Sequence, residues 1–353
     1  MLNYSADRLR AVGRAIFEAA GAPPATAARV ADSLVEANLT GHDSHGILRI
    51  AQYVGEIRAG YIDPAAQPRI ARETPVSALV DGAWTFGQVS ALYATDVAIE
   101  RAKSAGVGVV GLVRTNHIGR LGEYTSRAAE RGVVALYFAG GFGGPGSAPY
   151  GGAAVAYGTN PFSAGFPADE QPDVLVDFAT TGIAAGKIRF APAKRQPLPP
   201  GLLADRDGNP TTNPDDYFAG GMLLPMGGTV TGHKGYGLAV AVELLAQSLT
   251  GSDAWARESG GSPVYGRSGS LIVALDEALF RPADEVEKSA DAFLSRLRAV
   301  PPAPGFAEVL VPGDPERRTR ESRLRDGVQV PEATWAAMVE AGRGLGVDVE
   351  AIR

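Results

Sequence analysis

The sequence Gly141-Phe142-Gly143-Gly144-Pro145-Gly146 has the G-x-G-x-x-G spacing of a dinucleotide-binding loop. In the Rossmann fold such a loop follows a strand and opens a helix, because the pyrophosphate binds at the N-terminus of that helix. A strand-like run at 133–138 does precede this loop, but residues 147–152 read SAPYGG and cannot form a long helix. The match is therefore interpreted as accidental, and the sequence predicts a fold other than the Rossmann fold.

The segments on both sides of this loop predict an α/β or α+β layer architecture. Short runs rich in β-branched residues predict strands at residues 107–113, 133–138, 174–176 and 271–275. Apolar residues at helical spacing predict helices at residues 91–103 and 238–249. Two stretches rich in Gly and Pro are predicted to be long ordered loops, which in a compact domain are often functional: residues 140–152 and 192–214.

Both ends of the chain are predicted to be helical. Apolar spacing and helix-breaking residues predict helices over residues 5–20, 25–38, 47–60 and 331–345, the last on the surface. Ser5 is the predicted N-cap of the first helix. Residues 41–46 then form a polar joint between the second and third helices, and the sequence changes character after about residue 75.

The composition limits the chemistry and the partners. The chain has 353 residues and no Cys, which excludes a disulfide framework, a thiolate nucleophile, a Cys-ligated zinc and an iron–sulfur cluster. Its net charge of −6 argues against a nucleic-acid partner. The sequence shows no signal peptide and no uninterrupted apolar stretch of about 18 residues, so we expect no membrane association and a cytoplasmic location.

The four His of the chain all lie in polar segments with Gly nearby: His42 and His45 in GHDSHG, His117 in TNHIG and His233 in TGHKGYG. A single His in such a segment is usually a turn or helix-end residue. Four of them favour function, because catalytic groups concentrate on loops and the ordinary pKa of His suits proton transfer near neutral pH.

The segment GHDSHG, residues 41–46, allows three kinds of chemistry. Metal binding by His42 and His45 is disfavoured, since no acidic cluster completes the coordination shell and no metal is predicted. A Ser-His-Asp hydrolase is disfavoured because adjacent Ser44 and His45 cannot easily form the nucleophile–base hydrogen bond of a triad and no G-x-S-x-G elbow surrounds Ser44. The third possibility is proton transfer by His45 during hydride transfer to a carbonyl, with Ser44 tuning the imidazole. Arg49, one helical turn away, could hold a substrate carboxylate or, equally well, form a surface ion pair.

Candidate anion sites lie outside the accidental G-x-G-x-x-G match. Residues 232–237, GHKGYG, are predicted to open the helix at 238–249, so that Lys234 and the free N–H groups could hold a phosphate. Asp177, at the end of a predicted strand, could accept hydrogen bonds from a ribose or a nicotinamide, or could cap the next turn. Residues 312–314 with Arg317 and Arg318 are a weaker phosphate candidate.

Six segments make the chain resemble the type-2 malate/L-lactate dehydrogenases, in which they occur in the same order. They are GHDSHGILRIAQYVGEIRAG, TNHIGRLGEY, PYGGAAVAYGTNPFSAGFP, DFATTGIAAGKI, GGTVTGHKGYGLAVAVELL and VLVPGDPE, spanning about residues 41–313. The family includes L-sulfolactate dehydrogenase, ureidoglycolate dehydrogenase, 2,3-diketogulonate reductase and a cyclic imino-acid reductase. The resemblance implies a mixed α/β, non-Rossmann fold with helical N- and C-terminal segments, a homodimer, and hydride transfer between NADH or NADPH and a 2-oxo acid or related imine.

Roles for individual residues follow from the resemblance by position. It implies that Ser44 and His45 form the proton relay and donor, and that Arg49 binds the substrate carboxylate. His117 matches a His beside the nicotinamide that is the base in some members, and Thr159 faces the substrate. The implied cofactor contacts are His117, Ile118, Gly119, Arg120, Leu121, Asp177, Phe178, Ala179, His233, Lys234 and Gly313. Residues 1–75 with about 300–353 are implied to pack with the substrate site and make the dimer contact, and 76–299 to form the cofactor-binding α/β domain.

One position departs from part of the family. Some imine-reducing members carry an acidic residue near the position of Lys187, where it completes the Ser-His relay. Lys187 therefore favours an NAD(P)-dependent dehydrogenase of a malate-like or lactate-like acid. Three alternatives stay open: a reductase of a cyclic imino acid or ureidoglycolate-type substrate, a hydrolase built on His and Ser, and a nucleotide-binding protein without catalysis.

Overall fold

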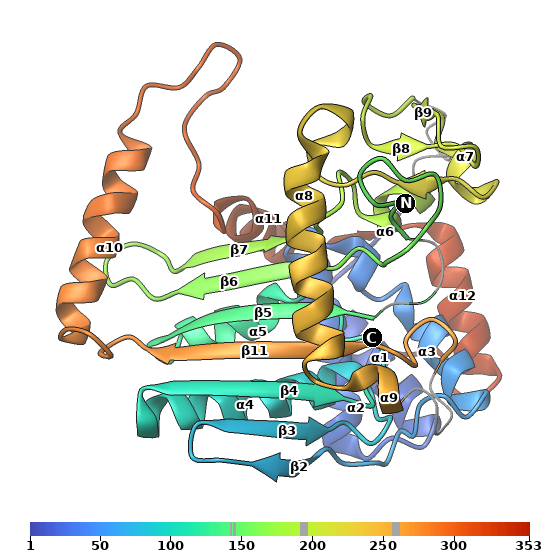
Figure 1. Cartoon of the computed structure of the whole chain (residues 1–353). Coiled ribbons are helices and arrows are strands. Elements are labelled where there is room, and N and C mark those ends of the chain that lie inside the picture. Colours follow the sequence, from blue (N-terminus) through green and yellow to red (C-terminus); the bar gives the residue numbers. More distant parts are fainter. Residues whose placement is uncertain (142, 144–145, 191–196, 256–261) are drawn as a thin grey trace.

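A seven-stranded sheet with the order β2-β3-β4-β11-β5-β6-β7 runs through the molecule (Figure 1). The computed structural model describes residues 1–141, 143, 146–190, 197–255 and 262–353. The strands are β2 (Arg69–Glu73), β3 (Ser77–Asp81), β4 (Val107–Val113), β5 (Val133–Gly140), β6 (Phe162–Phe166), β7 (Val174–Phe178) and β11 (Gly269–Asp276). All four strands predicted from β-branched runs are confirmed as β4, β5, β7 and β11.

The strand directions decide where a site can form. β3 and β4 are parallel, and every other neighbouring pair of this sheet is antiparallel. β4, β5 and β7 therefore all run in the same direction, and their C-terminal ends meet at one edge of the sheet. The loop after β4 and the last residues of β7 both lie at this edge.

Helices pack on both faces of the sheet. In Figure 1, α4 (Gly87–Ala105) and α5 (Gly122–Ala129) lie behind the sheet and α8 (Gly228–Glu243) crosses in front of it. The buried Ala and Val side chains of α4 pack against β-branched and Leu side chains of β3, β4 and β11, including Val80, Leu112 and Ile272. Burial of this apolar surface stabilises the sheet and fixes the loops at its edge.

The helical ends of the chain form a second core. It joins α1 (Ala6–Ala19), α2 (Pro24–Leu39) and α3 (Arg49–Arg58) to α12 (Glu332–Arg343) and to the antiparallel pair of β1 (Leu2–Tyr4) with β12 (Val328–Val330). Ser5 caps α1 as predicted, because its hydroxyl accepts a hydrogen bond from the Arg8 amide at 3.2 Å. The predicted terminal helices are confirmed within about two residues, although α12 buries Trp335 and Met338 in this core.

The prediction that residues 232–237 form a loop before a helix is wrong. α8 begins at Gly228, so GHKGYG lies inside the helix, which then passes into a π turn at Leu244–Ser248. The glycines serve close packing: a Cβ atom on Gly235 would lie 2.3 Å from the carbonyl oxygen of Met226. His233 and Lys234 consequently do not lie at a helix N-terminus.

We predicted that the G-x-G-x-x-G match is accidental, and the described part of this segment agrees with that prediction. Phe142, Gly144 and Pro145 lie outside the described residues. The Gly143 amide donates to the carbonyl of Val264 at 2.7 Å, and the Gly141 amide donates to Glu243 at 3.1 Å, so neither N–H is free for a phosphate. Residues 146–161, which are all described, contain no helix.

The second predicted loop is only partly a loop. Residues 192–196 lie outside the described residues, and the rest contains β8 (Leu203–Ala204) and β9 (Pro210–Thr211), which form a small sheet with β10 (Met222–Leu223). The other elements are α6 (Ala185–Phe190), α7 (Asp215–Phe218), α9 (Ser252–Trp255), α10 (Ala283–Arg298) and α11 (Asp314–Asp326). Within the described ranges, no helix is both long enough and apolar enough to cross a membrane.

Candidate active site

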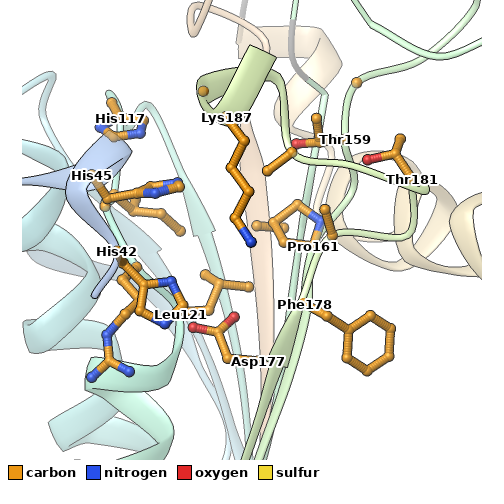
Figure 2. A pocket seen from close by; sticks show the side chains of 18 of the residues that line it. His42, His45, His117, Leu121, Thr159, Pro161, Asp177, Phe178, Thr181 and Lys187 are labelled. Atoms are coloured by element: carbon orange, nitrogen blue, oxygen red, sulfur yellow. The ribbon is translucent and has the colours of Figure 1, made fainter. Parts of the chain in front are cut away.

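A cavity of about 420 Å³ lies at the edge where β4, β5 and β7 end. Its wall is built from the segment after α2, the loop at 117–121 after β4, the end of β7 and the first residues of α6. Figure 2 shows His42, His45 and His117 on one side of the cavity and Thr159 and Phe178 on the other, with the Lys187 side chain extending from α6 between them. A volume of this size is typical of a small-molecule site.

The segment 41–46 is a tightly held turn. Asp43–His45 form one turn of 3₁₀ helix, and the Asn38 side chain of α2 braces it by donating to Asp43 at 2.6 Å and accepting from the Ile47 amide at 2.8 Å. A Cβ atom on Gly46 would lie 2.1 Å from the Asn38 oxygen, so only Gly fits there. Arg323 of α11 also binds Asp43, at 2.6 and 3.0 Å, which ties the turn to the C-terminal helices.

Ser44 and His45 interact directly. The hydroxyl of Ser44 lies 2.9 Å from Nδ1 of His45. Adjacent side chains thus do reach each other here, contrary to the argument against a triad, and the contact agrees with the prediction that Ser44 tunes the imidazole. The tight turn puts both side chains on one side. Burial, together with the charges of Arg49, His42 and Arg120, lowers the pKa of His45 from 6.5 to about 3. His45 is therefore neutral at neutral pH.

His117 lies next to His45 and has its own buried partners. The two imidazole rings are stacked, with centroids 5.6 Å apart and planes at 19°. Nδ1 of His117 lies 2.6 Å from the hydroxyl of Tyr53, which also accepts a hydrogen bond from the Gln88 amide at 2.8 Å. Burial and the charges of Arg49 and His45 hold the pKa of His117 well below its ordinary range, so this ring is neutral as well.

Arg49 lies at the cavity wall and is held in place by polar partners. Its Nε donates to the Ser44 carbonyl at 2.9 Å and its Nη1 donates to Gln52 at 2.6 Å; Gln52 in turn donates to Glu56 at 2.9 Å. Among the described residues, no carboxylate lies within ion-pair distance of Arg49, although a surface ion pair was an open alternative. The guanidinium is thus a fixed cation facing the cavity.

Asp177 and Arg120 form the charged end of the cavity. Asp177 accepts a hydrogen bond from the Gly122 amide at 2.7 Å, at the N-terminus of α5. Burial raises its pKa, and the charges of Arg120 and His42 oppose that rise. Nη1 of Arg120 is buried and has no hydrogen-bond partner among the described residues.

Most of the predicted site residues line this one cavity. They are His45, Arg49, His117, Ile118, Gly119, Arg120, Leu121, Thr159, Asp177, Phe178 and Ala179, and Ser44 touches it through His45. His233 and Lys234 are exposed on α8, and neither they nor Gly313, at the start of α11, line the cavity.

Sequence reasoning missed Tyr53, Gln88 and Tyr265. Tyr53 follows Arg49 by four residues on α3, a spacing that places both on one helix face and could have identified it. Gln88 on α4 and Tyr265, whose ring centroid lies 5.1 Å from that of His117, reach the site only through tertiary packing, and no local pattern marks them.

Comparison with known proteins gives one consistent result. A family model described as malate/L-lactate dehydrogenase matches residues 4–339. Hydroxycarboxylate dehydrogenase B of Escherichia coli O157:H7 is 35% identical over 99% of this chain and 96% of its own, and L-sulfolactate dehydrogenase of Methanocaldococcus jannaschii is 35% identical over 94% and 93%. The crystal structure of malate dehydrogenase from Entamoeba histolytica superposes with a TM-score of 0.90 at 27% identity, covering 98% of each chain.

A further structural neighbour carries a different substrate in its name. Delta1-piperideine-2-carboxylate reductase from Pseudomonas syringae superposes with a TM-score of 0.82 at 30% identity, covering 97% of this chain and 100% of its own. Together these likenesses confirm the fold class and the resemblance predicted from the sequence segments.

Proposed function

Because the chain belongs to the malate/L-lactate dehydrogenase family, we propose that it transfers a hydride between NAD(H) or NADP(H) and C2 of a small 2-oxo or 2-hydroxy acid. The observation that carries this proposal is the meeting of two stacked His rings and a fixed Arg in one cavity. A carboxylate binder beside proton-transfer groups is what a 2-oxo acid requires.

The cavity wall suits a dinucleotide. Nη1 of Arg120 is buried without a partner among the described residues, which fits an anionic group such as a pyrophosphate. The residues proposed to hold the cofactor are the loop 117–121 and the end of β7, residues 177–179, with His233, Lys234 and Gly313 kept as predictions. When bound, the nicotinamide supplies the hydride for reduction or accepts it in the reverse reaction.

The chain's own groups bind the acid and move the proton. We assign Arg49 to the substrate carboxylate, where two N–H groups can orient it, and Thr159 to the substrate side of the cavity. His45, hydrogen-bonded to Ser44, and His117 are the groups that exchange a proton with the C2 oxygen. A bound carboxylate adds negative charge beside both rings, which raises their pKa toward the working range.

The test is a substrate panel with single His variants. Wild type, His45→Ala and His117→Ala are assayed by nicotinamide absorbance with NADH and NADPH on pyruvate, oxaloacetate and sulfopyruvate. We expect turnover by the wild type and a loss of roughly 10²-fold or more in at least one variant. Arg343→Ala, on the exposed face of α12, is the matched control. Full activity in both His variants would show that the proposed mechanism is wrong.

A second candidate is the reduction of a cyclic imino acid, favoured by the likeness to the Pseudomonas syringae reductase. Lys187, which lines the cavity, favours the oxo acid instead. Adding piperideine-2-carboxylate and ureidoglycolate to the panel decides between these substrates. Turnover of an ester without any nucleotide would instead support the hydrolase alternative.

We also propose that the chain acts as a homodimer in the cytoplasm. The apolar side chains of Val230, Leu244 and Leu249 are exposed along α8 and its π turn, which is typical of a surface that another chain covers. Light scattering on the purified protein measures the mass directly, and a single species at the mass of one chain would contradict the proposal.

A further inference from the structure

Three buried polar side chains from different parts of the fold form one hydrogen-bonded chain behind the cavity. Gln88 of α4 donates to the hydroxyl of Tyr53 on α3 at 2.8 Å, and that hydroxyl lies 2.6 Å from Nδ1 of His117 in the loop after β4. Gln88 and Tyr53 are each only 1% exposed, whereas His117 also lines the cavity. Polar side chains buried this deeply are stabilised by the hydrogen bonds that they make with one another.

In the orientation that the Gln88 amide has in the structure, the direction of these hydrogen bonds selects one tautomer of His117. The Gln88 amide nitrogen can only donate, so the Tyr53 oxygen accepts from it. With this orientation of the amide, the single hydroxyl proton of Tyr53 is directed to Nδ1 of His117, which accepts it and carries no proton of its own. Burial raises the pKa of Tyr53, which keeps this proton on the phenol. A neutral His117 therefore carries its proton on Nε2.

His45 lacks such a constraint. The partner of its Nδ1 is the Ser44 hydroxyl, and a hydroxyl can donate or accept in the same position. The groups that face His117 from the surrounding elements are Arg49, His45, Tyr53 and Tyr265, none of which is a carboxylate. The Tyr53–Gln88 pair gives the hydrogen bond at the His117 ring a defined direction, whereas the Ser44 hydroxyl does not do so at His45.

The Gln88 amide can also accept a hydrogen bond from Tyr53. Its Oε1 atom is buried and has no hydrogen-bond partner among the described residues. A half-turn of the amide exchanges the donor for the acceptor, so that Tyr53 can donate to Oε1 and accept from an Nδ1–H of His117. Both hydrogen bonds, from His117 to Tyr53 and from Tyr53 to Gln88, can then form while His117 carries protons on both nitrogens.

We propose that Tyr53 and Gln88 are positioning residues that hold the His117 ring at the cavity and set which nitrogen carries its proton. In the direction shown by the structure, the Nε2–H group is available to the C2 oxygen of a bound oxo acid. With the amide reversed, the same two residues stabilise the doubly protonated ring. This assignment of roles rests on the proposed function, but the hydrogen-bonded chain itself can be tested without it.

The first test needs no substrate. The chain has only four His, so ¹⁵N-detected correlation spectra of the imidazole nitrogens resolve each ring, with assignment from single His→Gln variants. We expect the His117 signals of the wild type to show a neutral ring protonated on Nε2. In Tyr53→Phe we expect a shift toward a mixture of the two tautomers, while Tyr137→Phe, which removes a buried hydroxyl elsewhere in the sheet core, leaves His117 unchanged. Identical His117 signals in Tyr53→Phe and wild type would overturn the proposal.

The second test uses Gln88, in case Tyr53→Phe does not fold. Gln88→Glu places a carboxylate, which only accepts hydrogen bonds when it is ionised, behind Tyr53. Gln88→Met removes both the hydrogen-bond donor and the acceptor. We expect the pKa of His117, measured in the same spectra, to rise by roughly one unit in Gln88→Glu and not in Gln88→Met. An unchanged His117 titration in both variants would contradict the assignment of Gln88.

Kinetics separate this proposal from the proposed function. If the wild type turns over an acid of the panel, Tyr53→Phe should lower kcat by roughly tenfold or more with little change in KM, and Gln88→Glu should move the acidic limb of the kcat–pH profile upward. A wild type without turnover on any acid and with either nucleotide would refute the proposed function, while the spectra would still decide on the hydrogen-bonded chain. If the His117 spectra of both variants change as expected but kcat stays at the wild-type value in both, the role in proton transfer is refuted.

Discussion

Residues 41–46 and 232–237 are both short polar segments that place His between glycines, yet their surroundings in the structure differ. The first forms a braced 3₁₀ turn that brings His42 and His45 to the cavity, with Asn38 and Arg323 holding it from two helices. The second lies inside α8, where His233 is exposed and does not line the cavity.

This difference shows that Gly can be required beside a His for two different steric reasons. In 41–46, Gly46 is needed because Asn38 occupies the space of a side chain. In 232–237, Gly232 and Gly235 let neighbouring segments approach the helix closely. The composition of the two segments is similar, and only the contacts distinguish a turn that lines the cavity from a face that packs against neighbouring segments.

The largest expected effect is on the activity that depends on the 41–46 turn. Arg49→Ala removes the cation that this turn holds at the cavity through the Ser44 carbonyl. We expect kcat/KM for 2-oxo acids to fall by roughly 10²-fold or more, because a buried carboxylate loses its charged partner. Arg49→Lys restores the charge without the two-pronged geometry and should recover only part of the loss. Steady-state kinetics measure this, and wild-type kcat/KM in Arg49→Ala would contradict the assignment.

A methyl group at Gly46 should destabilise the turn. Its Cβ would lie 2.1 Å from the Asn38 oxygen, which cannot move without breaking its hydrogen bonds to Asp43 and Ile47. We expect Gly46→Ala to lower the free energy of unfolding by about 1–3 kcal/mol, measured by urea denaturation. A stability equal to that of the wild type would mean that the bracing by Asn38 is not required.

The buried His of the turn should make stability depend on pH. The pKa of His45 is about 3 in the folded protein and near 6.5 when unfolded, so below about pH 6.5 the unfolded state binds a proton that the folded state does not. Stability is fully present above that pH and is lost as the pH falls toward 3, by about 1.4 kcal/mol per unit for this one group. Urea midpoints from pH 7 to 5 should fall less steeply in His45→Asn than in the wild type, and parallel curves would contradict the prediction.

The smallest expected effect lies in the other segment and has the opposite sign. A Cβ atom on Gly237 would meet no neighbouring atom of the described residues within 4 Å, and the residue lies within α8. Because Ala is a better helix former than Gly, Gly237→Ala should raise the free energy of unfolding by about 0.5–1 kcal/mol. Destabilisation by Gly237→Ala in the same urea experiment would show that 232–237 is more constrained than its contacts indicate.

The sequence predicts those parts of the molecule in which local pattern and final contacts agree. The terminal helices and the strands β4, β5, β7 and β11 follow from periodicity, and the non-Rossmann fold follows from SAPYGG after Gly146. His45, Arg49, His117 and Asp177 were assigned to one site from the family resemblance, and the structure brings them together at one cavity.

The remaining parts depend on contacts between distant segments. The start of α8 was misplaced because Gly in a helix interior looks like a loop until its packing against Met226 is known. Gln88 reaches Tyr53, and Tyr265 reaches His117, from segments far apart in the chain, so no spacing within the sequence reveals them. The division at about residues 75 and 300 stays a prediction.

The central claim, hydride transfer to C2 in this cavity, is tested most directly by isotope transfer. The purified chain is incubated with oxaloacetate or pyruvate and NADH or NADPH carrying deuterium at both hydrogens of nicotinamide C4. We predict a 2-hydroxy acid with one deuterium on C2, formed by the wild type and strongly reduced in at least one of His45→Ala and His117→Ala. A hydroxy acid without deuterium at C2, or no hydroxy acid with any acid of the panel, would contradict the account.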